Sequence, residues 1–307
     1  MKKIYNNETP LVSIVIPTYN HGIYICRAID SVLNQTYKNW ELIIVDNYST
    51  DETEILVSEY NDSRIQYFKN HNHGIIAISR NFGIKKSNGD WIAFLDSDDW
   101  WKRNKLEYCM FYAILKNADI LYHDLILIKN NFRKYFLRTA KSRNLTKPIF
   151  YDLLINGNAI LNSSVIVKKD ILLKVGLLSQ SNDKFTWEDF DCWLKISQIS
   201  QNFFYLKKKL GFYWLGGGNN SNPERDLINS SSICLNYINN NLTYIPAWIL
   251  YSQGKAYYKK GQMIQGRKRL LQLINLNKSF SLSLKSIILI VYYQFRSYLI
   301  QLNHIKK

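Results

Sequence analysis

Trp91-Ile-Ala-Phe-Leu-Asp-Ser-Asp-Asp99 joins a short apolar run to three carboxylates in the four residues that follow. The apolar run predicts a buried strand. The carboxylates repel one another at this spacing, and a divalent cation removes that cost most readily. Mg²⁺ and Mn²⁺ take few protein carboxylates and complete their coordination with water and substrate phosphates. The stretch therefore indicates a metal site for a nucleoside diphosphate, and it leaves open the alternative of a solvated acidic loop.

The residues before this stretch alternate between strand and helix periods. Besides residues 91–95, apolar runs predict strands at residues 11–16, 41–45 and 64–68. Between them, helical spacing predicts helices at 25–33 and 75–86, and Ser49-Thr-Asp-Glu52 has the spacing of a capping box for a helix to about Tyr60. Such alternation implies an α/β fold with a mostly parallel sheet covered on both faces. Further along, we expect strands at 119–128 and 161–167 and a helix at 190–199.

Polar clusters follow three of the predicted strands, at Thr18-Tyr19-Asn20, Asp46-Asn47 and Asp96-Ser-Asp-Asp99. Ligands of open α/β sheets bind at the carboxyl ends of the strands. A fourth polar cluster, Trp187-Glu-Asp-Phe-Asp191, sets acids between large aromatic residues. Partial desolvation there would raise a carboxylate's proton affinity, as a general base requires. The alternative is a helix N-terminus with favourable acidic residues.

The formal net charge of +16 is concentrated near the C-terminus, because eleven Lys or Arg and no Asp or Glu follow Asp226. This basic region predicts helices from about Asn229, with a break at Ile245-Pro246. Its apolar run at 287–293 lies between Lys285 and Arg296, which leaves ten residues where about 20 are needed to span a bilayer. The region is therefore either a solvated helical pair or a peripheral contact with anionic lipid.

Other bulk features point to the cytoplasm. The four cysteines are scattered without a C-x-x-C pair, which favours a reducing compartment and argues against a zinc site. The first ten residues contain two lysines with no apolar run behind them, so we expect no secretory signal. Nucleic-acid binding is an alternative motivated by the charge, but no recognised motif accompanies it.

Together these residues resemble the inverting family 2 glycosyltransferases of the GT-A fold, of the type that builds bacterial O-antigen, capsule or lipopolysaccharide. The resemblance covers residues 11–222 and rests on blocks in family order: 12–20, 28–36, 40–46, 72–74, 79–83, 94–99 and 187–189. It implies a Rossmann-like GT-A sheet flanked by helices, with a C-terminal helical extension. We expect residues 1–226 to bind nucleotide-sugar and catalyse, and residues 227–307 to form the basic amphipathic helical region.

The resemblance also implies roles for individual residues. Pro17, Thr18 and Tyr19 would line the nucleotide-base pocket, where Asp46 would accept a hydrogen bond from the base. Arg80 would lie near the diphosphate. Asp96 would approach the ribose or the metal, and Asp98 would be the principal ligand of Mn²⁺ or Mg²⁺. The catalytic base would be Asp189, with Glu188 and Asp191 as alternatives.

One departure from the family pattern bears on the metal. Many relatives place a His before the Gly-Gly-Asn-x-Ser segment, whereas this chain has Gly216 there. No His ligand is therefore carried over.

The function implied is transfer of a hexose or N-acetylhexosamine from a nucleotide-sugar, UDP-linked by resemblance, to a saccharide acceptor that is lipid-pyrophosphate-linked. The enzyme would work in the cytoplasm, peripheral on the inner face of the membrane. A non-catalytic member that binds nucleotide-sugar without turnover is the alternative.

Overall fold

The computed structural model describes residues 9–129, 138–181, 185–216 and 222–305. The chain forms two compact units. The first, the sheet unit, comprises residues 1–150, 158–182 and 188–219. The second, the helical unit, comprises residues 151–157, 183–187 and 220–307.

The sheet unit is built outward from strand β1 (Val12–Thr18), which is buried along its whole length. It pairs in parallel with β2 (Trp40–Asp46) and with β4 (Trp91–Phe94), and β2 pairs in parallel with β3 (Ile65–Lys69). Thr18 lies opposite Asp46 in the register, so these two strands end side by side. The parallel half of the sheet confirms the predicted α/β class and brings the polar strand ends to one edge.

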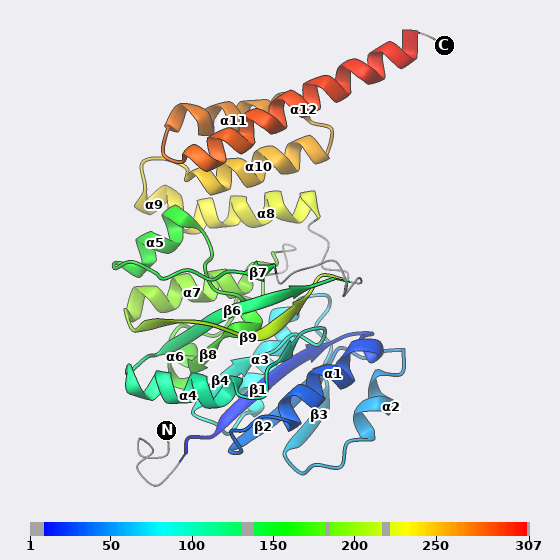
Figure 1. Ribbon diagram of the computed structural model, residues 1–307, viewed down its shortest axis with the longest axis vertical. Coiled ribbons are helices and arrows are strands. Elements are labelled where there is room, and N and C mark those ends of the chain that lie inside the picture. Colours follow the sequence, from blue (N-terminus) through cyan, green and yellow to red (C-terminus); the bar gives the residue numbers. More distant parts are fainter. Residues whose placement is uncertain (1–8, 130–137, 182–184, 217–221, 306–307) are drawn as a thin grey trace. The chain divides into compact units, whose positions relative to one another are not determined.

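The other half of the sheet is mixed. The order across the sheet is β3-β2-β1-β4-β8-β6-β9-β5 (Figure 1), with β7 paired to β6. The added strands are β5 (Trp100–Trp101), β6 (Ile120–Ile128), β7 (Thr139–Ala140), β8 (Ile166–Lys168) and β9 (Phe203–Trp214). The predicted strand at 161–167 is shorter than expected, because residues 162–164 form a 3-10 turn before β8. The twelve-residue strand β9 was not predicted.

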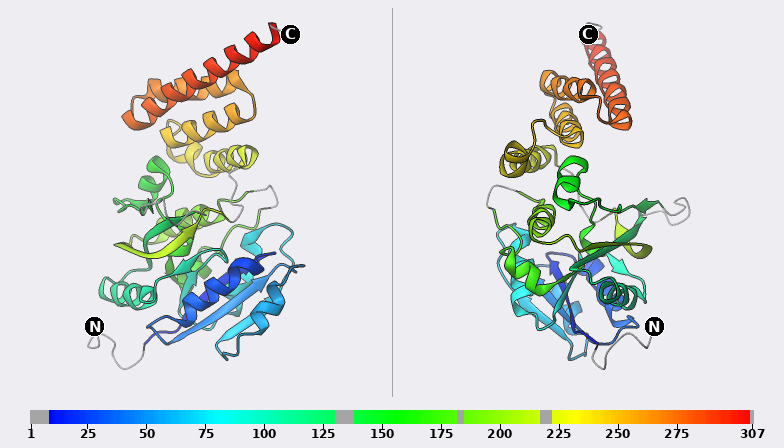
Figure 2. Two further views of the ribbon diagram at one scale, coloured as in Figure 1. Left: turned by 45° about the vertical axis from the view of Figure 1, so that its right-hand side comes forward. Right: turned by 90° about the vertical axis from the view of Figure 1, so that its left-hand side faces the viewer.

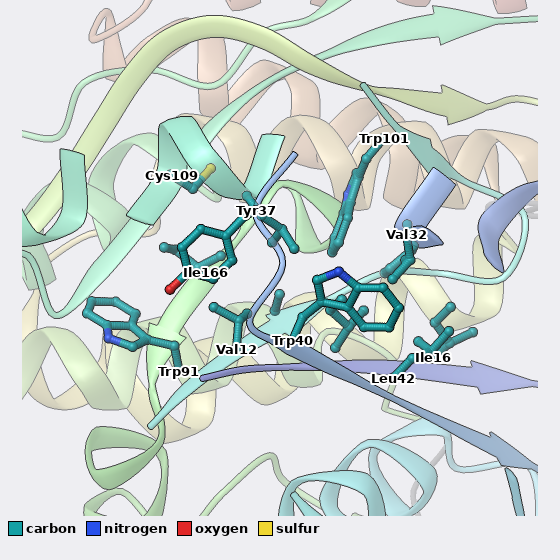
Figure 3. Close-up of a cluster of buried hydrophobic side chains, with 14 of the residues drawn as sticks. Val12, Ile16, Val32, Tyr37, Trp40, Leu42, Trp91, Trp101, Cys109 and Ile166 are labelled. Carbon is teal, nitrogen blue, oxygen red and sulfur yellow. The ribbon is translucent and has the colours of Figure 1, made fainter. Parts of the chain in front are cut away.

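Helices cover both faces of the parallel half. On one face, α1 (Gly22–Leu33) and α4 (Lys105–Leu115) contribute apolar side chains to a cluster that also contains residues of β1 and β2 and includes Trp40 and Trp101 (Figure 3). On the other face lies α3 (Ile76–Lys86), where a Cβ added to Gly83 would come within 2.5 Å of Val15. The close approach that Gly83 permits sets α3 directly on the sheet.

The capping box predicted at Ser49 is wrong. Helix α2 spans Thr53–Ser58, and Ser49 does not cap it, because its hydroxyl donates to Asp46 instead. Asp51 takes over part of the capping by accepting from the backbone N–H of Thr53 at 3.1 Å. The remaining helices of the sheet unit are α6 (Lys169–Lys174) and α7 (Glu188–Ile199), while α5 (Ile149–Asn156) spans a boundary between the units.

The helical unit contains successive helices that pack on one another (Figure 2). They are α8 (Pro223–Ile233), a π-helical turn at Cys234–Ile238, α9 (Asn239–Asn241), α10 (Ala247–Lys259), α11 (Met263–Leu276) and α12 (Phe280–Ile305). The predicted break is confirmed, since α10 begins directly after Pro246. Glycines 254 and 266 allow α10 and α11 to approach closely, because a Cβ at Gly254 would lie 2.5 Å from Leu270. Among the described residues, none of the helices has the length and apolar character needed to span a bilayer.

Candidate active site

The backbone is strained where the first three strands end. Asn20, Tyr48 and His73 follow β1, β2 and β3, and each has a positive φ, of 51°, 56° and 52°. Residues other than glycine rarely adopt this region, which costs on the order of 1–3 kcal/mol and is common at ligand sites. The strain therefore marks the same sheet edge that the sequence indicated.

Asp46, at the end of β2, is fully buried. Its carboxylate accepts hydrogen bonds from the Ser49 backbone N–H at 3.0 Å, from the Tyr67 hydroxyl at 2.6 Å and from the Ser49 hydroxyl. These contacts hold the loop after β2 in its turn. Burial and the hydrogen bond to Asp46 raise the pKa of Tyr67 above its ordinary value, so the hydroxyl stays a donor.

The residues predicted to line the base pocket differ in exposure. Pro17 and Thr18 are buried at the end of β1, whereas Tyr19 is 52% exposed. The Thr18 hydroxyl is buried and has no hydrogen-bond partner among the described residues. A buried hydroxyl without a partner is a group that a ligand can satisfy.

Arg80 joins the strand end at β4 to the start of α7. It lies on α3, is 4% exposed, and donates to Asp96 at 2.6 Å and to Glu188. Burial alone would lower the pKa of Arg80, but the carboxylates of Asp96 and Glu188 raise it overall. The guanidinium is therefore a fixed positive charge at the edge of the sheet.

The three acids at the start of α7 have different partners. Glu188 is 4% exposed and forms the ion pair with Arg80, and Asp191 is 3% exposed and pairs with Lys195 at 2.7 Å. Asp189 is half-buried, and its carboxylate accepts a hydrogen bond from the adjacent backbone N–H of Phe190 at 2.7 Å. Burial raises the pKa of Asp189 although Arg80 opposes the shift. Of the three, Asp189 is the acid without an ion pair among the described residues.

The aspartates after β4 fit a divalent cation. Burial, and then the neighbouring Asp96, raise the pKa of Asp98 to about 7. Asp99 is 1% exposed, and its Oδ2 atom has no hydrogen-bond partner among the described residues. A cation would offset this repulsion, and oxygen ligands of this kind suit Mg²⁺ or Mn²⁺.

The described residues contain no group of three or more His, Cys, Asp or Glu side chains arranged to hold a metal ion. A cation held here would therefore need donor phosphates and water to complete its coordination.

The structure explains why a side chain is disfavoured at position 216. A Cβ added to Gly216 would lie 2.8 Å from the Trp214 ring, closer than real contacts allow. The indole of Trp214 packs near Arg27, whose guanidinium lies 4.9 Å from the Trp214 ring and 3.7 Å from the Trp100 ring. A side chain at 216 would require the indole to move.

Two further residues beside the aspartates were not predicted. Arg27, on α1, donates to the backbone carbonyl of Asp98 at 2.7 Å. His21, just before α1, lies with its Nδ1 2.7 Å from the Ser97 hydroxyl, and burial lowers its pKa. Both precede the aspartates by about 70 residues, so no local sequence pattern links them.

The site residues thus fall into three groups: the hydrogen-bonded network of Arg80, the two acids next to that network in the sequence, and the two acids that have other partners. Hydrogen bonds bring together Arg80, Asp96 and Glu188. Asp98 follows two residues later, and Asp189 lies beside Glu188 at the N-terminus of α7. Asp46 bonds Ser49 and Tyr67, and Asp191 bonds Ser179 and Lys195, so neither joins the Arg80 network through a described hydrogen bond.

The parallel sheet and the charged network at its edge define an α/β protein with a candidate site at the strand ends, and comparison with known proteins identifies its family. Residues 13–176, more than half of the chain, match the model of glycosyl transferase family 2. The chain belongs to this family, which confirms the resemblance.

One curated relative is the UDP-Glc:alpha-D-GlcNAc-diphosphoundecaprenol beta-1,3-glucosyltransferase WfgD of Escherichia coli, 44% identical over 39% of this chain and 48% of the relative. The first curated relatives are matched over 48% to 62% of their own lengths.

Solved structures confirm the GT-A fold. TarS of S. aureus, residues 1–349 in complex with UDP-GlcNAc, aligns with a TM-score of 0.59 and 20% identity over 86% of this chain and 80% of that one. The mannosyltransferase PcManGT from Pyrobaculum calidifontis, in complex with GDP-Man and Mn²⁺, aligns with a TM-score of 0.57 and 14% identity over 95% and 84%.

Proposed function

We propose that this chain is an inverting, metal-dependent glycosyltransferase. It transfers a hexose or N-acetylhexosamine from a UDP-linked sugar to a hydroxyl of a lipid-pyrophosphate-linked saccharide, in the assembly of a surface polysaccharide. The observation that carries the proposal is the network in which Arg80 joins Asp96 to Glu188, next to Asp98 and Asp189. Donor binding and catalysis are assigned to residues 1–226, and membrane contact to residues 227–307.

Asp189 is proposed as the base because Glu188 and Asp191 are held in ion pairs. It takes the proton of the acceptor hydroxyl while that oxygen bonds to the anomeric carbon of the donor. The bond from that carbon to the phosphate oxygen breaks, and the nucleoside diphosphate leaves with the electron pair. Attack opposite the leaving group inverts the anomeric centre, and the raised pKa of Asp189 favours proton uptake.

The leaving diphosphate requires positive charge that is already in place. Arg80 supplies it at the sheet edge, and the Glu188 ion pair orients the guanidinium. Asp98 and Asp96 would hold Mn²⁺ or Mg²⁺, which when bound acts as a Lewis acid on the diphosphate. The strand end at Thr18 and Tyr19, where Thr18 lies opposite Asp46 in the register, would receive the nucleotide.

The nature of the acceptor is supported by the Escherichia coli relative, whose name gives a sugar linked through diphosphate to undecaprenol as its acceptor. A UDP-linked donor is supported by the same relative and by the UDP-GlcNAc complex of TarS. The Mn²⁺ of the mannosyltransferase complex supports the metal. With an acceptor of this kind, the reaction would take place at the inner face of the membrane, where the basic helical unit would meet anionic lipid.

The test is a screen of UDP- and GDP-sugars with Mn²⁺ or Mg²⁺, in which released nucleoside diphosphate is measured with and without a synthetic lipid-pyrophosphate-sugar acceptor. We expect one UDP-sugar to give acceptor-dependent release that EDTA abolishes, and NMR of the product to show an inverted anomeric centre. If the chain bound a donor but released no nucleoside diphosphate with any acceptor tested, it would be a non-catalytic member of the family instead. A retained anomeric configuration would contradict the proposed displacement.

A further inference from the structure

Helix α12 has one face that packs within the helical unit. Ile290 is 8% exposed and belongs to a small apolar cluster with Leu270 of α11 and Tyr258 of α10. The rings of Tyr258 and Tyr293 stack with 4.5 Å between their centroids. This face fixes α12 on its neighbours, so the opposite face is held outward.

The opposite face of α12 is also apolar. Large side chains at seven positions are 47–85% exposed, and we call them the α12 stripe: Phe280, Leu284, Ile287, Ile288, Val291, Tyr292 and Phe295. Their spacing of three, four and seven residues places them on one side of the helix. At a rise of 1.5 Å per residue the stripe is about 22 Å long. Single exposed apolar residues are ordinary, but a contiguous stripe marks a surface that binds something.

Basic residues accompany this stripe. At 100° per residue, Lys285 and Arg296 fall along one edge of it, next to Tyr292. Helix α11 repeats the combination, because exposed Ile264 and Leu271 line a shallow groove together with Arg267 and Lys268. The sequence after Asp226 contains eleven Lys or Arg and no acidic residue. The natural occupant of such a face is therefore anionic, whereas a second copy would bring eleven more positive charges to it.

We propose that the α12 stripe inserts into the interface of an anionic lipid bilayer, with Lys285, Arg296 and the basic residues of α11 at the headgroups. A helix with an apolar side and basic edges lies in the plane of the interface, and each Lys or Arg near the surface contributes about 1 kcal/mol. The inference deepens the proposed function, since a lipid-linked acceptor is reached from this surface. It rests on different residues from those of the sheet edge.

The test uses the full chain and vesicles of phosphatidylcholine with or without phosphatidylglycerol, an anionic lipid that gives the vesicle surface a negative potential. The stripe variant carries Ile288→Gln, Val291→Gln and Phe295→Gln. The matched control carries Ile55→Gln, Leu115→Gln and Leu173→Gln, which are exposed apolar residues of the sheet unit. Flotation measures binding, and light scattering measures the oligomeric state.

We expect the wild type and the control to float with anionic vesicles and to be released by high salt, because surface charge is screened. The stripe variant should bind at least about tenfold more weakly, since each buried CH₂ contributes about 0.8 kcal/mol. Its release of nucleoside diphosphate in vesicle-free buffer should equal that of the wild type, which separates this inference from the proposed function. Equal flotation by the stripe variant would overturn the inference. It would also be overturned if the wild type did not bind vesicles but formed a dimer and the stripe variant was a monomer.

Discussion

The two units of this chain differ in how their charged side chains are exposed and paired. In the sheet unit, the central charge of the candidate site is buried and paired, because Arg80 forms ion pairs with Asp96 and Glu188. In the helical unit, bases such as Lys285 and Arg296 stay exposed beside exposed apolar side chains. Buried, paired charges are fixed in one geometry and suit one small ligand. Exposed bases on an apolar helix suit an extended surface whose molecules vary in position.

The largest combined effect on stability and activity is expected from removing the buried cation. Arg80→Met leaves Glu188 buried without its partner, so the free energy of unfolding should fall by about 3–5 kcal/mol. Nucleoside diphosphate release per folded enzyme should fall by about 10²–10³-fold. Urea unfolding and the release assay measure the two effects.

The control for Arg80→Met is Lys174→Met, which breaks the ion pair with Asp170 at 3.0 Å, where both side chains are more than half exposed. Exposed pairs contribute about 0–1 kcal/mol. If the two variants were equally stable, the buried network would not differ from a surface pair, and the comparison between the units would fail.

The next effect concerns the metal. Asp98→Asn removes the carboxylate proposed as principal ligand, so a higher concentration of Mn²⁺ should be needed for half-maximal release, and kcat should fall on the order of 10²-fold. Titration of the release assay with Mn²⁺ measures both. Asp170→Asn on α6 is the matched control, since Asp170 is exposed and far along the chain. An unchanged Mn²⁺ titration in Asp98→Asn would remove Asp98 from the metal site.

The next effect is on the pH dependence of the free energy of unfolding, and it is smaller per pH unit. It distinguishes a buried histidine of the sheet unit from the exposed Lys and Arg side chains of the helical unit. Burial, and then the nearby Lys105, lower the pKa of His123 on β6 to about 3. The unfolded chain therefore binds a proton below about pH 6.5 that the folded chain does not bind until about pH 3. The free energy of unfolding should fall as the pH falls through this window, by up to about 1.4 kcal/mol per pH unit.

The measurement for His123 is urea unfolding at several pH values for the wild type and for His123→Leu. The variant should lose this part of the pH dependence, whereas His71→Leu, at an exposed position, should keep it. A pH dependence that is equal in all three proteins would show that burial does not hold His123 neutral.

The parallel half of the sheet could be predicted because its signals are local. β1, β2 and β4 are short, buried and mainly apolar runs, and helix α1 after β1 carries a regular apolar face. Strand β9 could not be predicted in this way, since Lys207, Lys208 and Lys209 interrupt its pattern and its pairing with β6 joins residues far apart in sequence. At Ser49 a local rule failed because the buried Asp46 competed for the hydroxyl.

The candidate site shows the same limit. The motif at 187–191 contains three acids, and from the sequence only the family resemblance favoured one of them as the catalytic base. Their partners separate them: Glu188 pairs with Arg80, which is 108 residues away, and Asp191 pairs with Lys195. Similarly, only the folded chain reveals that Trp214 blocks a side chain at Gly216 and that Arg27 lies beside Asp98.

The central claim is that Asp189 accepts the proton of the acceptor hydroxyl. The direct measurement is kcat for acceptor-dependent release in Asp189→Asn, together with the dissociation constant of the donor and the free energy of unfolding. Loss of a general base predicts a fall in kcat of about 10²–10⁴-fold while donor binding and stability stay close to those of the wild type. A kcat within a few-fold of the wild type would contradict the account.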